Sequence, residues 1–556
     1  MKRILTFIGI AMLSTSIFSQ PSWTKKAAQS VFTLKTFATD GTMIGSANGF
    51  FISENGECVS AFAPFSGAAR AIIIDAKGKE MSVDCILGAN ETYDVVKFKV
   101  EAKRTQPIHI ATVPLQSGNE VWLMPYSTGK GKEPVQGEIS KTETFQEQYT
   151  YYTIKANTEN HPAGSLLLDG NGEAVGLLQQ SANSKTSACY GVSAEFACNL
   201  KINGLSINDA ALKSTSIKKA LPEQLDQAIL TMYIAGSTLD SAGYTSIVND
   251  FIQKFPSAPD GYVYRAQIAS DANRFADAAR DMEQAIKVAE KKDEPHYNYA
   301  NLIYAKETYK KDIPYEKWSL DKAAEEAEAA YTINPLPTYR QLKAEIRITQ
   351  KQYNEAYDIY MQLADNGTKT AEIYFAAARC KALLNDTTAM LALMDSTVNT
   401  FSRPYLKDAA PYILARAQAL NKAGQFRAAV ADYNEYERLM TSKLTDSFYY
   451  IRAQAEMEGH MYQPAINDMV KAIDMAPTNT LYYAEKASFE IRLGLLDDAI
   501  ATANRCIELD ATQSDGFLFL GLAQCLKGDK ANGIKNLQKA GELGDEQAHQ
   551  LIEQYK

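Results

Sequence analysis

The chain has 556 residues, of which 46% are hydrophobic and 22% charged, a balance typical of folded domains and not of disordered or collagen-like chains. At ~150 residues per domain, this length predicts roughly three or four domains. The formal net charge is -9 and the sequence has no basic patch. Nucleic-acid binding, which depends on Lys and Arg neutralising phosphates, is therefore not expected.

Residues 1–19 have the pattern of a secretory signal peptide. Lys2 and Arg3 precede a short apolar run over 4–13, and Ser19 offers a small residue at a cleavage point. The run is too short to span a bilayer, and no later run is long enough, so no integral membrane segment is expected after removal of the signal. We expect a secreted protein, periplasmic in a double-membrane bacterium; the alternative is an uncleaved anchor.

Residues 25–205 have a β-strand pattern. Short runs rich in β-branched and aromatic residues, such as 95–100, are separated by turn signals such as Asn55-Gly56. Many short strands with regular turns predict a barrel or a sandwich. Residues 206–221 are rich in Ser, Lys and Ala, which is typical of a linker.

From residue 222 onward the pattern is helical and repeats itself. The small residues Ala453, Ala487 and Gly521 are spaced by 34 residues, and each is followed by a turn and a second small residue. Two helices can cross closely only where one presents a small side chain to the other. A single helix pair cannot bury its apolar face, so neighbouring pairs must stack.

This repeated pattern of small residues and turns resembles the tetratricopeptide repeat (TPR) family over residues 222–556, with eight or nine units and the helix 545–556 as a cap. The resemblance implies a concave groove that holds a protein or peptide partner. The groove would be lined by variable positions on the first helix of each unit. Helical phase selects these binding candidates: Asn298, Asn301, Arg340, Lys343, Arg379, Arg416, Arg452 and Lys486.

The first part of the chain carries motifs of a second family. The segment 45–52, Gly-Ser-Ala-Asn-Gly-Phe-Phe-Ile, resembles the opening strand of trypsin-like domains of the HtrA type, and 54–60 matches the hairpin that follows. The family then carries its general base, a His. Residues 61–68 align with that motif without a gap, and Ala63 falls at the His position.

Two further trypsin motifs follow in order. Residues 87–100 resemble the segment that carries the acid, with Asp94 at its position. Residues 160–166 resemble the nucleophile loop, with Pro162 at the Ser position. The resemblance covers about 28–203. It implies an N-terminal all-β trypsin-like double β-barrel, followed here by an all-α TPR solenoid.

The substitutions decide what chemistry the barrel retains. The triad needs a hydroxyl, a base that takes its proton, and an acid that holds the base. Ala63 has no base and Pro162 has no hydroxyl. Pro also lacks the N–H that would serve the oxyanion hole, where one donor is worth about 10²–10³ in rate. Only Asp94 is retained, so no catalytic residue is expected. The leading hypothesis is a protein-binding adaptor or scaffold without enzymatic activity.

Two alternatives stay open. The first is an active trypsin-like endopeptidase with substrate-recruiting repeats, in which Ser165 or Ser60 replaces the nucleophile and His161 lies near the loop. His109 is interpreted as a strand residue. The second alternative is a helical array that serves self-assembly. The partner and the oligomeric state are not determined by the sequence.

No cofactor or metal site is expected, since no phosphate-binding loop, dinucleotide fingerprint or zinc-protease motif is present and the five His are scattered. The seven Cys leave pairing open. In the first domain the candidate pairs are Cys58 with Cys85 and Cys189 with Cys198. The last three are expected to be buried thiols that pack as small hydrophobes.

Overall fold

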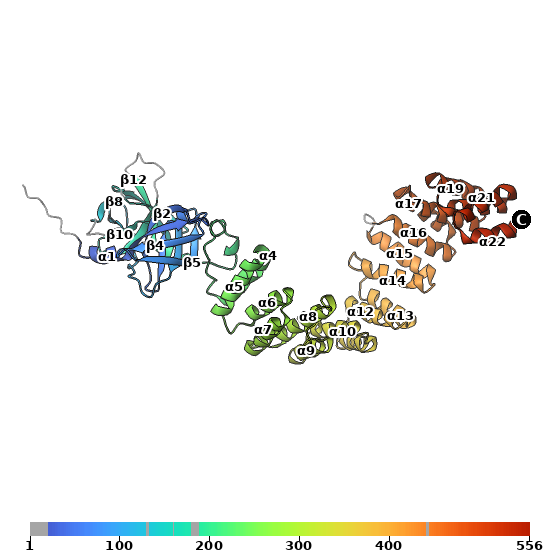
Figure 1. Ribbon diagram of the computed structural model, residues 1–556, viewed down its shortest axis with the longest axis horizontal. Coiled ribbons are helices and arrows are strands. Elements are labelled where there is room, and N and C mark those ends of the chain that lie inside the picture. The colour runs from blue at the N-terminus through green and yellow to red at the C-terminus, as the bar shows by residue number, and fades with distance from the viewer. Residues whose placement is uncertain (1–20, 129–132, 159–160, 180–187, 441–443) are drawn as a thin grey trace, which may run out of the picture. The chain divides into compact units, whose positions relative to one another are not determined.

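The protein is described by a computed structural model (Figure 1). The described residues are 21–128, 133–158, 161–179, 188–440 and 444–556. The expected signal peptide, 1–19, lies outside them. The chain divides into two compact units, the first ending at Ile268 and the second beginning at Ala269. Within the described residues, no helix has the length and apolarity needed to cross a bilayer.

The first unit begins with a closed six-stranded barrel in the order β1-β2-β3-β6-β5-β4. Its strands are β1 (Val31–Phe37), β2 (Met43–Phe51), β3 (Glu57–Ser60), β4 (Arg70–Asp75), β5 (Glu80–Asn90) and β6 (Val95–Val100). Alternate residues face the interior, as the two-residue period of a strand requires. Phe32, Leu34 and Phe98 are fully buried there.

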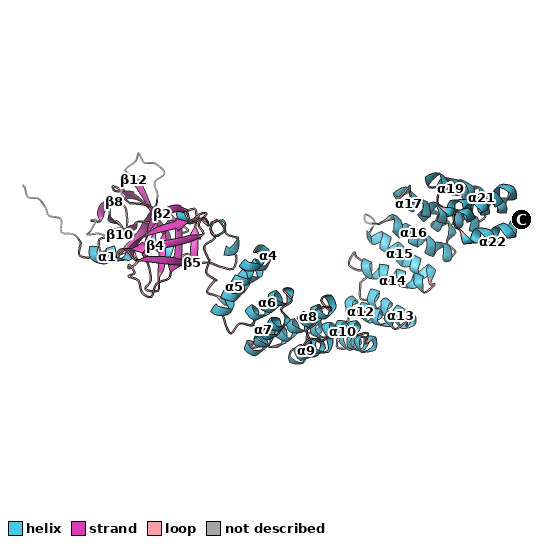
Figure 2. Cartoon of the chain, in the orientation of Figure 1, coloured by secondary structure: helices cyan, strands magenta, loops and turns pink. Residues whose placement is uncertain are grey.

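A second closed six-stranded barrel follows in the order β10-β11-β12-β9-β8-β7. Its strands are β7 (Glu120–Met124), β8 (Val135–Phe145), β9 (Tyr149–Lys155), β10 (Leu166–Leu168), β11 (Ala174–Gln179) and β12 (Ala188–Ser193). Phe50 and Val95 of the first barrel pack in one apolar cluster with Leu166 and Leu177 of the second. Figure 2 shows the strands gathered in the N-terminal part of the chain. Their closure into two barrels confirms the double-barrel prediction.

The segment 206–221 is not a free linker. It forms a short turn of helix (Ser206–Asn208) and α3 (Ala210–Lys213), and Leu212 and Ile217 are buried in the first barrel's core. Its backbone bonds to β5, where the Ile86 N–H donates to the Lys218 carbonyl (2.8 Å) and Ile86 accepts from Ala220 (2.9 Å). The prediction of a linker over 206–221 is therefore wrong, because Leu212 and Ile217 fill one end of the first barrel.

The first helices of the helical array belong to the same unit as the barrels. They are α4 (Leu225–Thr238), α5 (Ser241–Lys254) and α6 (Pro259–Asp271), the last of which contains the boundary between the units. The Gly204 N–H donates to the Gln227 side chain at 3.0 Å, and the Lys254 ammonium donates to the Leu221 carbonyl at 2.8 Å. These contacts fasten α4 and α5 to the end of the barrel segment.

The second unit consists of helices in the described residues (Figure 2). They are α7 (Phe275–Val288), α8 (Asp293–Tyr309), α9 (Leu320–Ile333), α10 (Pro337–Thr349), α11 (Tyr353–Asp365), α12 (Ala371–Leu383), α13 (Thr387–Asn399), α14 (Ala410–Lys422), α15 (Phe426–Met440), α16 (Asp446–Glu458), α17 (Tyr462–Met475), α18 (Thr480–Arg492), α19 (Leu496–Leu509), α20 (Ser514–Lys527), α21 (Lys530–Glu542) and α22 (Glu546–Tyr555). Each helix from α8 to α21 packs on the next.

Small residues lie where paired helices cross, as the repeat pattern predicts. A Cβ on Gly521 of α20 would lie 2.8 Å from the Gly533 carbonyl of α21, and one on Gly533 would lie 2.3 Å from the Cys525 sulfur. Ala453 and Ala487, at the matching positions of earlier repeats, are fully buried. The 34-residue spacing is therefore a spacing of close helix contacts.

All seven cysteines are free thiols, and neither candidate pair is joined. Cys58 lies on β3 and Cys85 on β5, and β6 lies between these strands. Two inter-strand steps separate them by roughly 9–10 Å, beyond the ~7 Å reach of a disulfide. Burial raises the pKa of the Cys85, Cys189 and Cys198 thiols to about 11.

Candidate functional site

Asp94, which the trypsin resemblance aligns with the acid, lies beside Ala63, which it aligns with the base. Asp94 has a left-handed backbone (φ 46°) in the turn before β6. Its carboxylate Oδ1 accepts a hydrogen bond from the Ala63 N–H at 2.7 Å, and its carbonyl accepts one from Phe62 at 3.3 Å. The fold thus brings Asp94 and Ala63 together as the trypsin resemblance implies. The side chain at the base position is a methyl group.

The nucleophile loop is held against β2. Pro162 is exposed, and the Asn48 N–H donates to the Ala163 carbonyl at 2.9 Å. Gly164 has φ +82°, and a Cβ on it would lie 2.0 Å from the Asn48 carbonyl oxygen. The loop therefore packs so closely that only glycine fits at this point. Asn160, at the start of the loop, lies outside the described residues.

Neither alternative nucleophile is poised to attack. The Ser165 hydroxyl is buried, donates to the Pro162 carbonyl (2.7 Å) and accepts from the Asn48 amide (3.0 Å). The Ser60 hydroxyl is buried and donates to the Asn48 carbonyl (2.6 Å). A nucleophilic serine instead donates to a base that can take its proton. The Ser165 hydroxyl thus ties the loop to β2, and the Ser60 hydroxyl ties β3 to β2. No sequence motif predicted the central role of Asn48.

Of the two histidines in the barrels, His161 adjoins Pro162 and His109 lies before β7. His161 is half-buried next to Pro162, and its backbone N–H donates to the Thr158 carbonyl at 2.9 Å. His109 is exposed on the connection before β7, where its carbonyl accepts from Ala174 at 2.7 Å. Within the described residues, no cluster of His, Cys, Asp and Glu could hold a metal ion.

Three of the predicted groove residues in the helical array form internal cross-links. The Arg416 guanidinium makes two bonds to Asp432, at 2.7 and 2.8 Å. Arg452 makes the same pair of bonds to Asp468, at 2.6 and 3.1 Å. In the following repeat, the Lys486 ammonium donates at 3.1 Å to Thr502, the residue equivalent to Asp468. Each cation thus joins the two helices of its own repeat, and Arg452 is only 3% exposed.

Two other predicted residues share one carboxylate. Arg340 and Lys343 of α10 lie 3.5 and 3.2 Å from the same oxygen of Glu328 on α9. Both cations are half-buried, and the Arg340 guanidinium also covers the Tyr331 ring at 4.6 Å. Both charges are therefore directed at Glu328 within the array and not at a partner.

The remaining predicted residues are more accessible. The Arg379 side chain is 50% exposed and has a loose ion pair with Glu345 at 3.8 Å. Asn298 and Asn301 of α8 are half-buried, and the Asn301 amide donates to the Tyr297 carbonyl. Arg379 is thus the predicted binding residue with the most exposed charge.

Arg452 is the centre of a buried charge cluster that helical phase alone did not reveal. Besides Asp468, its guanidinium pairs with Glu437 at 2.6 Å and lies 3.9 Å from Glu456. Glu456 is 4% exposed, and its Oε2 has no hydrogen-bond partner among the described residues. Burial, together with the neighbouring Asp468 charge, raises the pKa of Glu456 to about 7.

Glu456→Gln is expected to stabilise the array above neutral pH. The folded state holds the Glu456 proton more tightly than the unfolded chain, whose carboxyl has a pKa of 4.5. Stability is therefore lost as pH rises from about 4.5 to about 7, in total about 3 kcal/mol. In urea unfolding, the variant should match the parent near pH 4.5 and exceed it by about this amount at pH 8. Exposed Glu458→Gln is the control, and a pH-independent difference would contradict the assignment.

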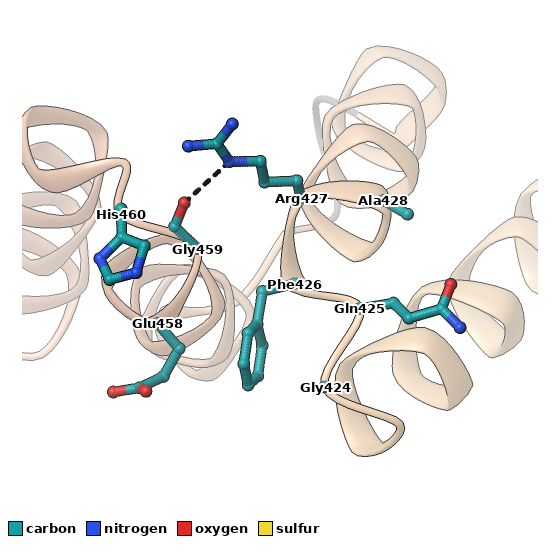
Figure 3. Close-up of a pocket in the computed structure, with 8 residues that line it drawn as sticks. All are labelled: Gly424, Gln425, Phe426, Arg427, Ala428, Glu458, Gly459 and His460. Atoms are coloured by element: carbon teal, nitrogen blue, oxygen red, sulfur yellow. Dashed lines mark hydrogen bonds between the residues drawn. The ribbon is translucent and has the colours of Figure 1, made fainter.

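Successive repeats are also tied at their turns. Figure 3 shows Arg427, at the start of α15, reaching the turn after α16, where its Nε donates to the Gly459 carbonyl at 3.1 Å. The two turns border an open hollow of about 410 Å³. Glu458 at its edge pairs with Arg492 of the following repeat at 2.9 Å. These side chains link neighbouring repeats in a fixed order.

Comparison with known proteins finds sequence similarity to TPR-containing proteins over part of the chain. No family model matches this chain. The small glutamine-rich tetratricopeptide repeat-containing protein 2 of Saccharomyces cerevisiae is 29% identical over 91 residues, and DnaJ homolog subfamily C member 7 of Mus musculus is 32% identical over 87. Each match covers 16% of this chain, and the chain spans 26% and 18% of these two relatives' lengths.

Among solved structures, the active form of the Rv3671c protease from M. tuberculosis is 18% identical, with a TM-score of 0.28, over 32% of this chain and 82% of that one. Two closed six-stranded barrels precede helix pairs with 34-residue spacing. The chain folds into two closed six-stranded β-barrels followed by a TPR-like helical solenoid.

Proposed function

We propose that this chain is a secreted protein-binding adaptor whose barrel does not cleave peptide bonds. The observation that carries the proposal is the state of the nucleophile loop. Pro162 stands where the attacking hydroxyl would be, and the nearby Ser165 hydroxyl is buried and donates to the Pro162 carbonyl. Without a hydroxyl and a base to take its proton, the ancestral acyl-transfer route has no first step.

The barrel would act as a rigid recognition module. The Asp94–Ala63 bond and the clamp between Gly164 and Asn48 keep both ancestral loops in place although the reacting groups are gone. A scaffold of this kind can still hold an extended peptide by strand addition, in which backbone hydrogen bonds give affinity and side-chain pockets give selectivity.

The helical array would supply the main binding surface. Stacked helix pairs form extended surfaces suited to protein segments, and the similarity to TPR-containing relatives supports this use. Most of the cations predicted to line the groove neutralise carboxylates within the array, whereas Arg379 is half exposed. It is the residue we assign to contact an acidic group of the partner.

The test is capture of peptides from a random library by the immobilised full chain, with mass spectrometry of the eluted peptides. We expect peptides to be captured and to remain uncut. Arg379→Ala should weaken capture of acidic peptides by about tenfold, the value of one charged hydrogen bond. Arg505→Ala is the matched control, because its side chain is similarly exposed (54%) and lies on α19, the second helix of its repeat. New peptide ends that depend on the chain would refute the non-enzymatic assignment, and no capture would refute the adaptor.

A further inference from the structure

A cavity of about 270 Å³ lies in the first unit, between the barrel-bound segment and the first helix pair. Its walls are mainly apolar. Ile202 and Leu212 come from the segment that closes the first barrel, and Leu239 and Ile247 come from the end of α4 and from α5. The residues that line the cavity are remote in sequence from Asp94, Pro162 and Arg379. Neither the triad nor the array accounts for it.

The charges that line this cavity do not cancel. Asp250 lines it, but the Lys218 ammonium neutralises that carboxylate at 2.8 Å. Lys219 also lines it, is half-buried, and donates to the Thr215 carbonyl. Burial lowers the pKa of Lys219, which is the direction expected for an ammonium that has lost water without gaining an anion.

A second cation borders the same space. Lys213 lines the cavity, and its ammonium donates to the Asn208 side-chain oxygen at 3.1 Å. Within the described ranges, neither Lys213 nor Lys219 has a carboxylate within ion-pair distance. Two lysines without a carboxylate partner thus border an apolar space. For the half-buried Lys219 this costs free energy until an anion arrives, whereas Lys213 reaches the cavity from solvent.

We propose that this cavity binds an aliphatic chain that ends in a carboxylate, a medium-chain fatty acid. The apolar walls would take the hydrocarbon and exclude it from water. The carboxylate would accept charge-assisted hydrogen bonds from Lys213 and Lys219. The volume lies near the lower end of the roughly 300–1,000 Å³ of ligand sites, which favours one short chain over a two-chain lipid.

The test is calorimetric titration of the full chain with decanoate, decanol and decyltrimethylammonium. We expect one decanoate per chain, decanol bound about tenfold more weakly, and no binding of the cation, because a hydrogen bond to a charged group is worth about a factor of ten. Equal affinity for decanoate and decanol would overturn the proposal. The proposal would also be overturned if the protein failed to bind decanoate but bound a peptide with a free carboxyl-terminal leucine.

Variants locate the site. Lys213→Met should weaken decanoate about tenfold and leave decanol unchanged, and it removes only an exposed side chain. Lys219→Met should do the same if the variant folds. Lys77→Met removes a lysine in an exposed turn of the first barrel and is the matched control. An equal loss in Lys77→Met and Lys213→Met would assign the binding to the net charge of the surface and overturn the cavity site.

Discussion

Arg452→Met is expected to lower the free energy of unfolding of the helical array by about 3–5 kcal/mol, the usual effect of removing one partner from a buried ion pair. The guanidinium is 3% exposed and bonds Asp468 and Glu437. Without it, these two carboxylates and Glu456 remain close together in the interior without their shared cation. Urea unfolding followed by the helical circular dichroism signal would measure the loss.

The control for this variant is Arg492→Met. Arg492 pairs with Glu458 at a similar distance, 2.9 Å, but its side chain is 48% exposed. Exposed pairs contribute roughly 0–1 kcal/mol because water and salt screen them. A loss in Arg452→Met no larger than in Arg492→Met would show that the cluster around Arg452 is hydrated and does not support the array.

Gly164→Ala is expected to destabilise the barrel unit by about 3 kcal/mol, the sum of overpacking and left-handed backbone strain. The added Cβ would lie 2.0 Å from the Asn48 carbonyl, and the residue has φ +82°. To relieve the clash, the loop must leave β2, which breaks the bond between Asn48 and Ala163. Near-ultraviolet circular dichroism, dominated in this unit by the packed Trp23 and Trp122 rings, would follow the thermal transition.

Gly170→Ala serves as the control for the loop variant. Gly170 lies in the turn between β10 and β11, and a Cβ there would have no heavy atom within 4 Å. Its carbonyl, which accepts the Trp23 indole N–H at 2.9 Å, is unaffected by the change. Equal transition temperatures for Gly164→Ala and Gly170→Ala would mean that the loop is free to move away from β2.

Periodicity predicted the helical array, because its helix contacts repeat along the chain, but for the first part it left a barrel or a sandwich open; the double barrel followed from the trypsin resemblance. The spacing of Ala453, Ala487 and Gly521 records helix crossings, and ordered motifs placed Ala63 next to Asp94. The structure confirms the helix packing, which follows from a local pattern, and the two closed barrels, whose strand order joins distant segments such as β3 and β6.

Features that depend on a distant partner were not predictable in this way. The composition of 206–221 indicated a linker because its Ser and Lys residues outnumber Leu212 and Ile217, whose burial requires the open end of a particular barrel. Helical phase placed Arg452 on a groove face, but its burial is set by Asp468 on the other helix. A charged side chain reveals its environment only together with the group that neutralises it.

The backbone bonds between Ile86 and the segment 206–221 have a practical consequence. The change in composition near residue 205 is not a place where the molecule can be divided. A fragment that stopped there would lose Leu212 and Ile217 from its interior and expose apolar surface at one mouth of the barrel. The boundary between the two compact units lies later, inside α6, so a fragment that keeps the core of the first barrel intact must include the segment 206–221.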